Sequence, residues 1–368
     1  MILMFVRILT RVKKQGCKFN FGNLIKMNKR EVRKRLNRLF YLRGDEPLKR
    51  TARIDYLPGG SDREFYRITE GENTFIAMFT LVQSQVQKFR LIERYLIKRG
   101  IWVPDFIAAA ESLYLLVMED VGQGSLYKIV KSTDDNEFIE QRYRWVIESL
   151  IHMQIAASKD IEKCKPVYKR VFGYKDFRWE SNYFRWSFLE VFCGYSSKET
   201  KNLDEDFHNI ASCLVDEPLF FMHRDFQSTN IFFKEGYVRI VDFQDAHRGL
   251  LTYDLASLLR DAYVSLSREM RNRLFSYYYS MLREKTNLYK DIKKFRRVYV
   301  LSAIQRNMQA LGAFAFLSKF MKKRWFRKAI PQGVKYLKEG LEEIQDFKVL
   351  NEIVNSKRVA KCVKSISS

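Results

Sequence analysis

Three short runs of β-forming residues, separated by two tight turns, constrain the fold of this chain most. The runs are ARIDYL, EFYRIT and TFIAMFT, all between residues 52 and 80, and the turns contain Pro-Gly-Gly-Ser-Asp and Glu-Gly-Glu-Asn. Gly, Pro, Asn and Asp supply the backbone geometry of tight turns, and strands joined by such turns pair side by side in opposite directions. We therefore expect a small antiparallel sheet in this part of the chain.

The rest of the chain is dominated by helical patterns. We expect a helix over residues 82–99 and then two strands within 101–122, of which YLLVME is apolar on both faces and therefore central in the sheet. Helical spacing returns at 136–160 and 177–215. Two β-like runs, LFFMHRD and YVRIVDF, bracket a loop, and everything beyond Tyr253 is helical. This order predicts an α+β protein with a small antiparallel sheet lobe and a larger, mainly helical lobe.

Basic residues are concentrated at the two ends of the chain. Lys and Arg number 66 against 43 Asp and Glu, which gives a net charge of +23. The excess lies in residues 1–50 and 262–368, whereas residues 51–261 carry a small net negative charge. The basic ends are expected either to contact an anionic membrane surface weakly or to form a solvated surface. No nucleic-acid partner is expected, because no recognition-helix, zinc or aromatic single-strand motif accompanies the charge.

The cysteines and the N-terminal residues bear on the compartment. Five cysteines show no CxxC spacing, which is typical of a reducing compartment and predicts a cytoplasmic protein. Arg7 and Arg11 interrupt the N-terminal apolar run, so we expect neither a signal peptide nor a membrane-spanning helix there. The sequence leaves open whether residues 1–26 belong to the folded protein.

The densest run of chemically active residues is MHRDFQSTNIFFKEGYVRIVDFQDAHRG. Asn230 follows Asp225 by five positions, and Asp242 lies at the end of an apolar β run. Phosphoryl transfer needs one carboxylate to take the proton of the attacking hydroxyl, together with an amide oxygen and a second carboxylate to hold Mg²⁺. A loop and a following hairpin would bring the three side chains to one place. The alternative is a buried polar hairpin in which Asp and Asn cap local turns.

The segments HRDFQSTNIFF, VDFQDA and TYDLASLLRDAY resemble the aminoglycoside phosphotransferase and choline kinase superfamily, which is related to the protein kinases. GGSDREFYRI, DFRWESNYF, IQRNMQALGAFAFL and IPQGVKYL are similar to the bacterial kinases that phosphorylate the anomeric hydroxyl of N-acetylmuramate and N-acetylglucosamine. The resemblance spans about residues 54–337 and implies a two-lobed, protein-kinase-like fold.

The resemblance also implies roles for single residues. Asp225 corresponds to the catalytic base, and Asn230 and Asp242 correspond to the Mg²⁺ ligands. His223 and Arg224 are similar to the residues that shape the catalytic loop. In a separate motif, Asp254 resembles the carboxylate that braces this loop; a helix N-terminal carboxylate is a compatible interpretation.

The nucleotide is expected to meet the sheet lobe. By the same resemblance, Gly60 and Ser61 belong to the turn that covers the phosphates, where backbone N–H groups approach closely because no bulky side chain intervenes. The Met118 carbonyl and the Asp120 N–H are implied to meet the edge of adenine. A Gly-Gly turn is also common in ordinary hairpins.

One departure from the kinase pattern concerns a cation. Protein kinases place a lysine on the third strand against the nucleotide phosphates, whereas TFIAMFT contains none. Either Arg63 or Arg67 supplies the charge, or the chain binds nucleotide without turnover. Gln244 also replaces the glycine of the D-F-G motif, so we expect no protein-kinase-like flip of this segment.

Several polar residues are candidates for acceptor binding because they lie within apolar or aromatic stretches of the helical lobe. Each is also a candidate for an ordinary hydrogen bond in the core. They are Glu180, Asp245, His247, Gln305 and Arg306.

Taken together, the sequence predicts an ATP- and Mg²⁺-dependent small-molecule kinase for a sugar hydroxyl. The resemblance favours the anomeric hydroxyl of N-acetylmuramate or N-acetylglucosamine, as in cell-wall recycling. The alternatives are another acceptor, such as an aminoglycoside, choline or a lipopolysaccharide sugar, and a nucleotide-binding pseudokinase scaffold. The predicted parts are a basic extension with a short helix (1–50), a nucleotide-binding lobe (51–120), a catalytic and substrate lobe (121–340) and a basic tail (341–368).

Overall fold

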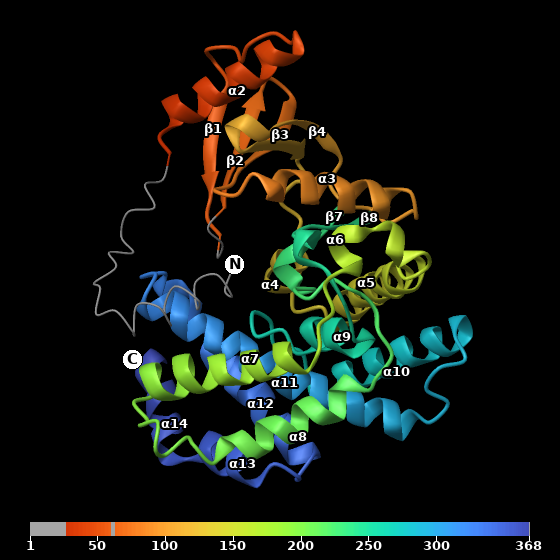
Figure 1. Ribbon diagram of the computed structural model, residues 1–368, viewed down its shortest axis with the longest axis vertical. Coiled ribbons are helices and arrows are strands. Elements are labelled where there is room, and N and C mark those ends of the chain that lie inside the picture. Colours follow the sequence, from red (N-terminus) through yellow and green to blue (C-terminus); the bar gives the residue numbers. More distant parts are fainter. Residues whose placement is uncertain (1–26, 60–62, 368) are drawn as a thin grey trace. The chain divides into compact units, whose positions relative to one another are not determined.

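The computed structural model describes residues 27–59 and 63–367, which form two compact units (Figure 1). Unit 1 contains the described residues up to Glu93 together with Pro104–Asp120. Unit 2 contains Arg94–Val103 and the chain from Val121 onward. The four ranges predicted from the sequence stay a prediction.

Unit 1 is built on a five-stranded antiparallel sheet with the order β1-β2-β3-β5-β4. The predicted sheet and its central apolar strand are confirmed, because β5 lies between β3 and β4 and its first four residues are buried. The strands are β1 (Arg53–Leu57), β2 (Glu64–Glu70), β3 (Asn73–Phe79), β4 (Phe106–Ala110) and β5 (Leu115–Glu119).

Helix α2 (Lys29–Arg43) completes the core of unit 1. The Asn28 side chain caps its first turn, and Gly44 ends it in the left-handed conformation at φ 76°. Its apolar stripe, which includes Val32 and Leu36, is fully buried against the hydrophobic core of the sheet. The helix expected at this place is present, and although the sequence grouped it with the basic extension, its packing makes it part of unit 1.

Unit 2 is mainly helical, as expected. Its helices surround α11, whose side chains are buried along most of its length. Helix α3 (Ser84–Ile97) runs across the division between the units. The others are α4 (Leu126–Ser132), α5 (Asn136–Ala156), α6 (Lys165–Tyr168), α7 (Tyr174–Tyr183), α8 (Leu203–Val215), α9 (Leu251–Leu259), α10 (Arg268–Lys285), α11 (Ile292–Lys319), α12 (Ile330–Glu343), α13 (Lys348–Asn355) and α14 (Lys357–Ser367), with a π-helical stretch η4 (Phe184–Phe192) after α7.

Two small sheets flank the predicted catalytic loop. Strand β8 (Tyr237–Ile240) pairs with β7 (Ile231–Lys234), while β6 (Phe220–Met222) pairs with β9 (His247–Gly249). The predicted pair of β-like runs therefore belongs to two different sheets. The reason is the two-residue turn at Glu235 and Gly236, both with positive φ, which closes the β7–β8 hairpin directly.

A glycine allows α11 to approach the π-helical stretch closely. A Cβ atom added at Gly312 would lie 2.9 Å from Cδ1 of Tyr183 and 3.2 Å from the backbone nitrogen of Phe184. The Ser187 hydroxyl donates a hydrogen bond of 2.8 Å to the Gly312 carbonyl. Contact of the two backbones at this point fixes α7 and η4 against the central helix of unit 2.

None of the helices within 27–59 and 63–367 is both long and apolar enough to cross a membrane. The N-terminal run that contains Arg7 and Arg11 lies outside the described residues. The predicted cytoplasmic location stays a prediction.

Substituting Gly312 with Ala should destabilise the protein, although Gly→Ala inside a helix ordinarily gains about 1 kcal/mol. We expect a loss of about 1–3 kcal/mol in the free energy of unfolding, measured by urea denaturation, because the added methyl carbon would lie 2.9 Å from Cδ1 of Tyr183 and 3.2 Å from the backbone nitrogen of Phe184. Gly333→Ala in α12 is the matched control, since its nearest neighbour is the movable end of the Leu311 side chain. A Gly312→Ala variant as stable as the wild type would contradict this packing.

Candidate active site

The loop after β6 is held by a buried carboxylate. The backbone N–H groups of His223 and Arg224 donate hydrogen bonds of 2.7 and 2.8 Å to the two carboxylate oxygens of Asp254, which is fully buried at the start of α9. Arg224 has a left-handed backbone at φ 79°. The chain therefore turns sharply at Arg224 and presents Asp225 beyond the end of the strand.

Burial also changes the protonation of this carboxylate. Removal from water raises the pKa of Asp254 to about 7, and the two backbone N–H donors oppose that shift only in part. Near neutral pH the group is thus a mixture of neutral and ionised forms. Both forms can accept the two hydrogen bonds, so the brace persists across this range.

His223 joins the loop to the β7–β8 hairpin. Its ring is fully buried, and Nε2 lies 2.9 Å from the Val241 carbonyl, to which it must donate. Burial lowers the pKa of His223, so the ring is neutral. His223 therefore shapes the loop, and it brings the end of β8 next to the segment that contains Asp225.

Asp225 is the exposed carboxylate of this loop. Its side chain is 39% exposed, and Nη2 of Arg306 approaches Oδ1 at 3.4 Å. The guanidinium of Arg306 is itself buried and fixed by Ser257 and Gln309 at 2.7 and 2.6 Å, and it also donates to Gln227 at 3.1 Å. A rigid cation thus orients one oxygen of Asp225, while the carboxylate remains accessible to solvent.

Asn230 and Asp242 reach the same loop. The side-chain amide of Asn230 donates through Nδ2 to the Asp225 carbonyl at 3.0 Å, and the backbone carbonyl of Asn230 accepts from the Val241 N–H at 3.0 Å. Asp242 follows directly, with a left-handed backbone at φ 65°, and its carboxylate accepts a hydrogen bond from Gln244. The structure therefore brings the three predicted residues Asp225, Asn230 and Asp242 together in one unit.

The donor set fits Mg²⁺. With Nδ2 of Asn230 used inside the loop, its Oδ1 atom and the Asp242 carboxylate are the hard oxygen ligands that this ion prefers. Within the described part of the chain, no group of three or more His, Cys, Asp or Glu could hold a metal ion. Mg²⁺ in proteins usually keeps several water ligands and also binds substrate phosphates, so it needs few ligands from the protein. One carboxylate and one amide oxygen are consistent with such a site.

A second buried carboxylate supports the segment between Asp225 and Asn230. Asp261 accepts hydrogen bonds from the backbone N–H and the hydroxyl of Ser228, at 2.8 and 2.5 Å. Burial raises the pKa of Asp261. Sequence reasoning missed this brace, although Asp261 lies in the quoted motif TYDLASLLRDAY, because a contact across 33 residues leaves no local pattern.

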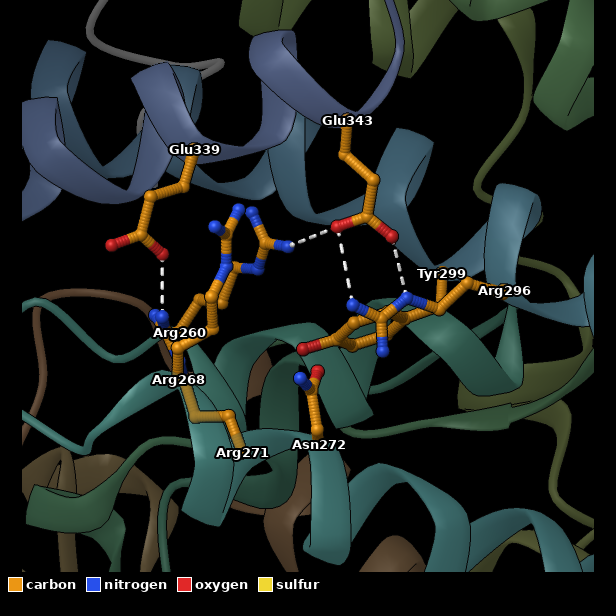
Figure 2. A pocket seen from close by; sticks show the side chains of 8 residues that line it. All are labelled: Arg260, Arg268, Arg271, Asn272, Arg296, Tyr299, Glu339 and Glu343. Carbon is orange, nitrogen blue, oxygen red and sulfur yellow. Dashed lines mark hydrogen bonds and ion pairs between the residues drawn. The ribbon is translucent and has the colours of Figure 1, made fainter.

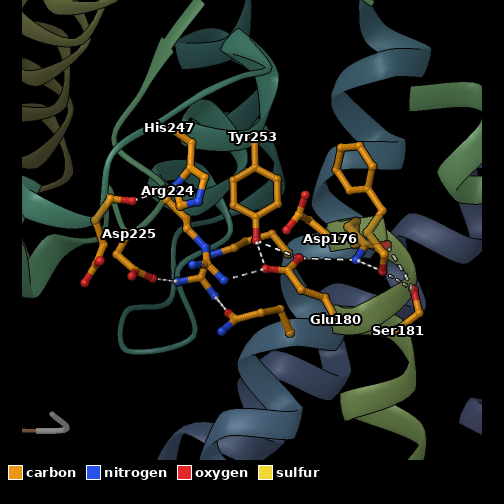
Figure 3. A network of polar contacts seen from close by, with 12 residues as sticks. Asp176, Glu180, Ser181, Arg224, Asp225, His247 and Tyr253 are labelled. Carbon is orange, nitrogen blue, oxygen red and sulfur yellow. Dashed lines mark hydrogen bonds and ion pairs between the residues drawn. The ribbon is translucent and has the colours of Figure 1, made fainter. Parts of the chain in front are cut away.

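Glu180 lies inside a buried network, which Figure 3 shows. Its carboxylate accepts hydrogen bonds of 3.0 Å from the Tyr253 hydroxyl and 3.2 Å from Gln305, and Arg224 approaches it at 3.4 Å. Glu180 and Gln305 are fully buried, and Gln305 also accepts from Ser181. In this structure Gln305 fixes the Glu180 carboxylate, and Glu180 in turn holds Arg224 in place.

Asp245 and His247 also make contacts within unit 2. Nδ1 of His247 lies 2.7 Å from the Asp245 carbonyl, and the Asp245 carboxylate approaches Arg170 at 3.5 Å. Burial, together with the nearby arginines, lowers the pKa of His247 to about 2. His247 is therefore neutral, and it is the residue that pairs with Met222 across β6 and β9.

Comparison with protein-family models now bears on this geometry. The model of the APH phosphotransferase enzyme family matches residues 54–288, which is more than half of the chain. The chain belongs to this family. The phosphotransferase therefore uses ATP to transfer phosphate to a hydroxyl acceptor, and the family, the fold and the enzyme class expected from the sequence are confirmed.

Individual relatives agree with this assignment. The phosphotransferase is 23% identical to the N-acetylmuramate/N-acetylglucosamine kinase of Pseudomonas aeruginosa over 311 residues. The matched region covers 82% of this chain and 88% of that protein. It is 32% identical over 126 residues to the enzyme of the same name from Neisseria meningitidis. This shorter match covers 34% of this chain and 38% of that protein. A choline/ethanolamine kinase family protein from Mesorhizobium loti superposes with a TM-score of 0.60 at 14% identity, covering 89% of this chain and 99% of that one. That last likeness shows the fold.

In unit 1 of the phosphotransferase, an ion pair joins β2 to the end of β5. The guanidinium of Arg67 donates through Nε and Nη2 to the two carboxylate oxygens of Asp120, at 2.5 and 2.8 Å. Met118 is buried in β5. Gly60 and Ser61 lie outside the described residues. The nucleotide-binding roles of these five residues stay predictions.

A small polar pocket lies in unit 2 beside the C-terminus of α9 (Figure 2). Glu343 accepts from Arg296 at 2.5 Å and from Arg260 at 3.5 Å, and Glu339 accepts from Arg271 at 2.5 Å. These ion pairs tie α9, α10 and α11 to α12. Arg260 directly precedes Asp261, so the pocket walls support the helix end that holds Ser228.

Replacing Asp254 with Asn should change how stability depends on pH. The folded pKa of about 7 lies above the ordinary value of 3.8, so between these values the folded state keeps a proton that the unfolded state has lost. The contribution of Asp254 to stability is therefore complete below pH 4 and falls as the pH rises through 7.

Between pH 5 and pH 8, we expect the free energy of unfolding of the wild type to fall by on the order of 2 kcal/mol relative to that of Asp254→Asn. Urea denaturation of both proteins across this range measures the difference. A difference that stays constant with pH would show that Asp254 titrates normally.

Proposed function

We propose that this phosphotransferase phosphorylates the anomeric hydroxyl of N-acetylmuramate or N-acetylglucosamine, with Asp225 as the base. The observation that carries the proposal is that the Asp225 carboxylate is both accessible and held in a fixed direction. It is the exposed acid of a loop whose backbone is fixed by Asp254, His223 and Asp261, and a buried arginine orients one of its oxygens. A general base needs this combination of accessibility and fixed direction.

The choice of acceptor is supported by the relatives. Two curated relatives from Pseudomonas aeruginosa and Neisseria meningitidis have N-acetylmuramate/N-acetylglucosamine kinase as their name, and the first matches over most of both chains. A role in cell-wall recycling follows if this acceptor is correct.

In the proposed reaction, Arg306 binds Oδ1 of Asp225 and leaves Oδ2 to accept the proton of the acceptor hydroxyl. Asn230 fixes the Asp225 carbonyl, so the loop does not need to reorganise during proton transfer. Oδ1 of Asn230 and the Asp242 carboxylate would hold Mg²⁺. When bound, the ion would supply positive charge to the transferred phosphate.

We assign ATP binding to unit 1. Gly60 and Ser61 are proposed to cover the phosphates, and Met118 and Asp120 to meet adenine through their backbone atoms. Arg67 is proposed to supply the cation that the lysine-free third strand lacks. Its guanidinium is already oriented by two hydrogen bonds to Asp120, so little side-chain entropy would be lost when it meets a phosphate.

Choline, an aminoglycoside or another sugar are the alternative acceptors, and the missing third-strand lysine is the observation behind the pseudokinase scaffold considered from the sequence. ATP consumption across N-acetylmuramate, N-acetylglucosamine, choline and an aminoglycoside separates them. Turnover with the two amino sugars alone is the expected result. Turnover only with choline or the aminoglycoside would reassign the acceptor, and nucleotide binding without turnover on any acceptor would favour the scaffold.

Asp225→Asn should reduce kcat at least a hundredfold, because general-base catalysis typically contributes a factor of about 10² to 10⁴. Nucleotide affinity should stay within about twofold of the wild type, since the substitution preserves shape and the contact to Arg306. A coupled ADP-release assay and fluorescence titration with a nucleotide analogue measure the two quantities. Asp216→Asn, at an exposed position after α8, is the control. Near-normal turnover of Asp225→Asn would remove this residue from the mechanism.

Asp242→Asn tests the proposed metal ligand without disturbing the backbone, because Asn tolerates the left-handed conformation at φ 65°. We expect the Mg²⁺ concentration for half-maximal rate to rise at least tenfold, since a neutral amide is a weaker ligand than a carboxylate. Initial rates over a Mg²⁺ titration give this value, with Asp216→Asn as the reference. An unchanged Mg²⁺ dependence would argue against Asp242 as a ligand.

A further inference from the structure

Two cysteines that are distant in the sequence meet at the end of the π-helical stretch. Cys193 follows the last residue of η4, and Cys362 lies in α14 near the C-terminus. Their Sγ atoms are 2.7 Å apart across a sequence separation of 169 residues. Cys362 also lies 3.7 Å from the Phe192 carbonyl. The sequence spacing of the cysteines had indicated no disulfide framework, and only the fold brings this pair together.

Other contacts hold the two segments in register independently of sulfur. The Tyr195 hydroxyl is 2.6 Å from that of Ser356, and Arg358 donates to Glu199 at 2.9 Å while its guanidinium lies over the Tyr195 ring at 4.4 Å. These interactions attach the start of α14 to the chain that follows η4. The approach of the two thiols is therefore supported by contacts of the segment that follows Cys193.

The surroundings favour the thiolate form of Cys362. Arg358 lies four residues earlier on the same helix, and therefore on the same face, and α14 contains no acidic residue. The hydrogen bond from the Cys193 thiol lowers the pKa of Cys362. A partly accessible thiol that accepts a hydrogen bond from a second thiol is typical of an oxidisable pair.

We propose that Cys193 and Cys362 are a redox modification site, at which a peroxide converts the thiol pair into an intrachain disulfide. The Cys362 thiolate attacks one peroxide oxygen, the O–O bond breaks, and hydroxide leaves to give a sulfenic acid. Cys193 then attacks the sulfenic sulfur, an S–S bond forms, and water leaves. In total two thiols and hydrogen peroxide give one disulfide and two waters, so each sulfur loses one electron.

Little movement is needed for this step. A disulfide has an S–S length of about 2.05 Å, so the two sulfur atoms must approach each other by only roughly 0.7 Å. The bond would fasten the C-terminal helix to η4, which continues directly from the helix that contains Glu180. In a reducing compartment the pair stays a dithiol, and an external dithiol reverses the oxidation.

The experiment uses the full chain, treated with hydrogen peroxide and then digested without reduction. Mass spectrometry should find the peptide of Cys193 linked to that of Cys362 in the wild type and in Cys213→Ser, whose substituted cysteine is exposed and serves as the control. The linked peptide should be absent from Cys193→Ser and Cys362→Ser. Dithiothreitol should abolish it in the wild type.

Stability provides a second measurement. Oxidised wild type should unfold at a temperature at least about 3 °C above the reduced form, because the cross-link closes a long loop. Cys193→Ser should show no such increase, even if it folds less well. Absence of the linked peptide after peroxide has oxidised Cys213, or cross-links that join Cys193 or Cys362 to other cysteines instead, would overturn the proposal.

Discussion

The catalytic loop depends on a carboxylate that does not face solvent. Asp254 lies in the first turn of α9, is fully buried, and accepts hydrogen bonds from two consecutive backbone N–H groups at the point where the chain leaves β6. These donors have no strand partner at this turn, and leaving them unpaired in the interior would cost about 1–3 kcal/mol each. Every later feature of the site, from the turn at Arg224 to the exposure of Asp225, starts from this contact.

Around that contact, buried side chains hold the two arginines of the site in fixed positions. Glu180 is buried with Arg224, and Arg306 is buried with three neutral partners while its fourth contact is Asp225. Buried ion pairs add little net stability when compared with apolar packing, but removal of one partner leaves an uncompensated charge. Glu180 therefore fixes the direction of Arg224 more than it adds stability, while the neutral partners of Arg306 fix the arginine that orients Asp225.

Local motifs predicted the centre of the site well, and its supports poorly. Asp225, Asn230 and Asp242 lie within 18 residues, so the spacing itself placed them on one loop and hairpin. Arg306 and Asp261 act from other helices, and only the packing of unit 2 shows what they touch. The strands β7 and β9 are three or four residues long, which is too short for a period-2 pattern, and so their pairing was not anticipated.

The left-handed backbone of Arg224 has a consequence for the evolution of the enzyme. Glycine would adopt φ 79° without steric cost, and a single nucleotide change converts many arginine codons to glycine codons. That change would nevertheless leave Glu180 buried without its cation, beside Tyr253 and Gln305 alone. Substitution of Arg224 is therefore tolerated only when Glu180 is also replaced, and we expect the two residues to be lost or kept as a pair across the family.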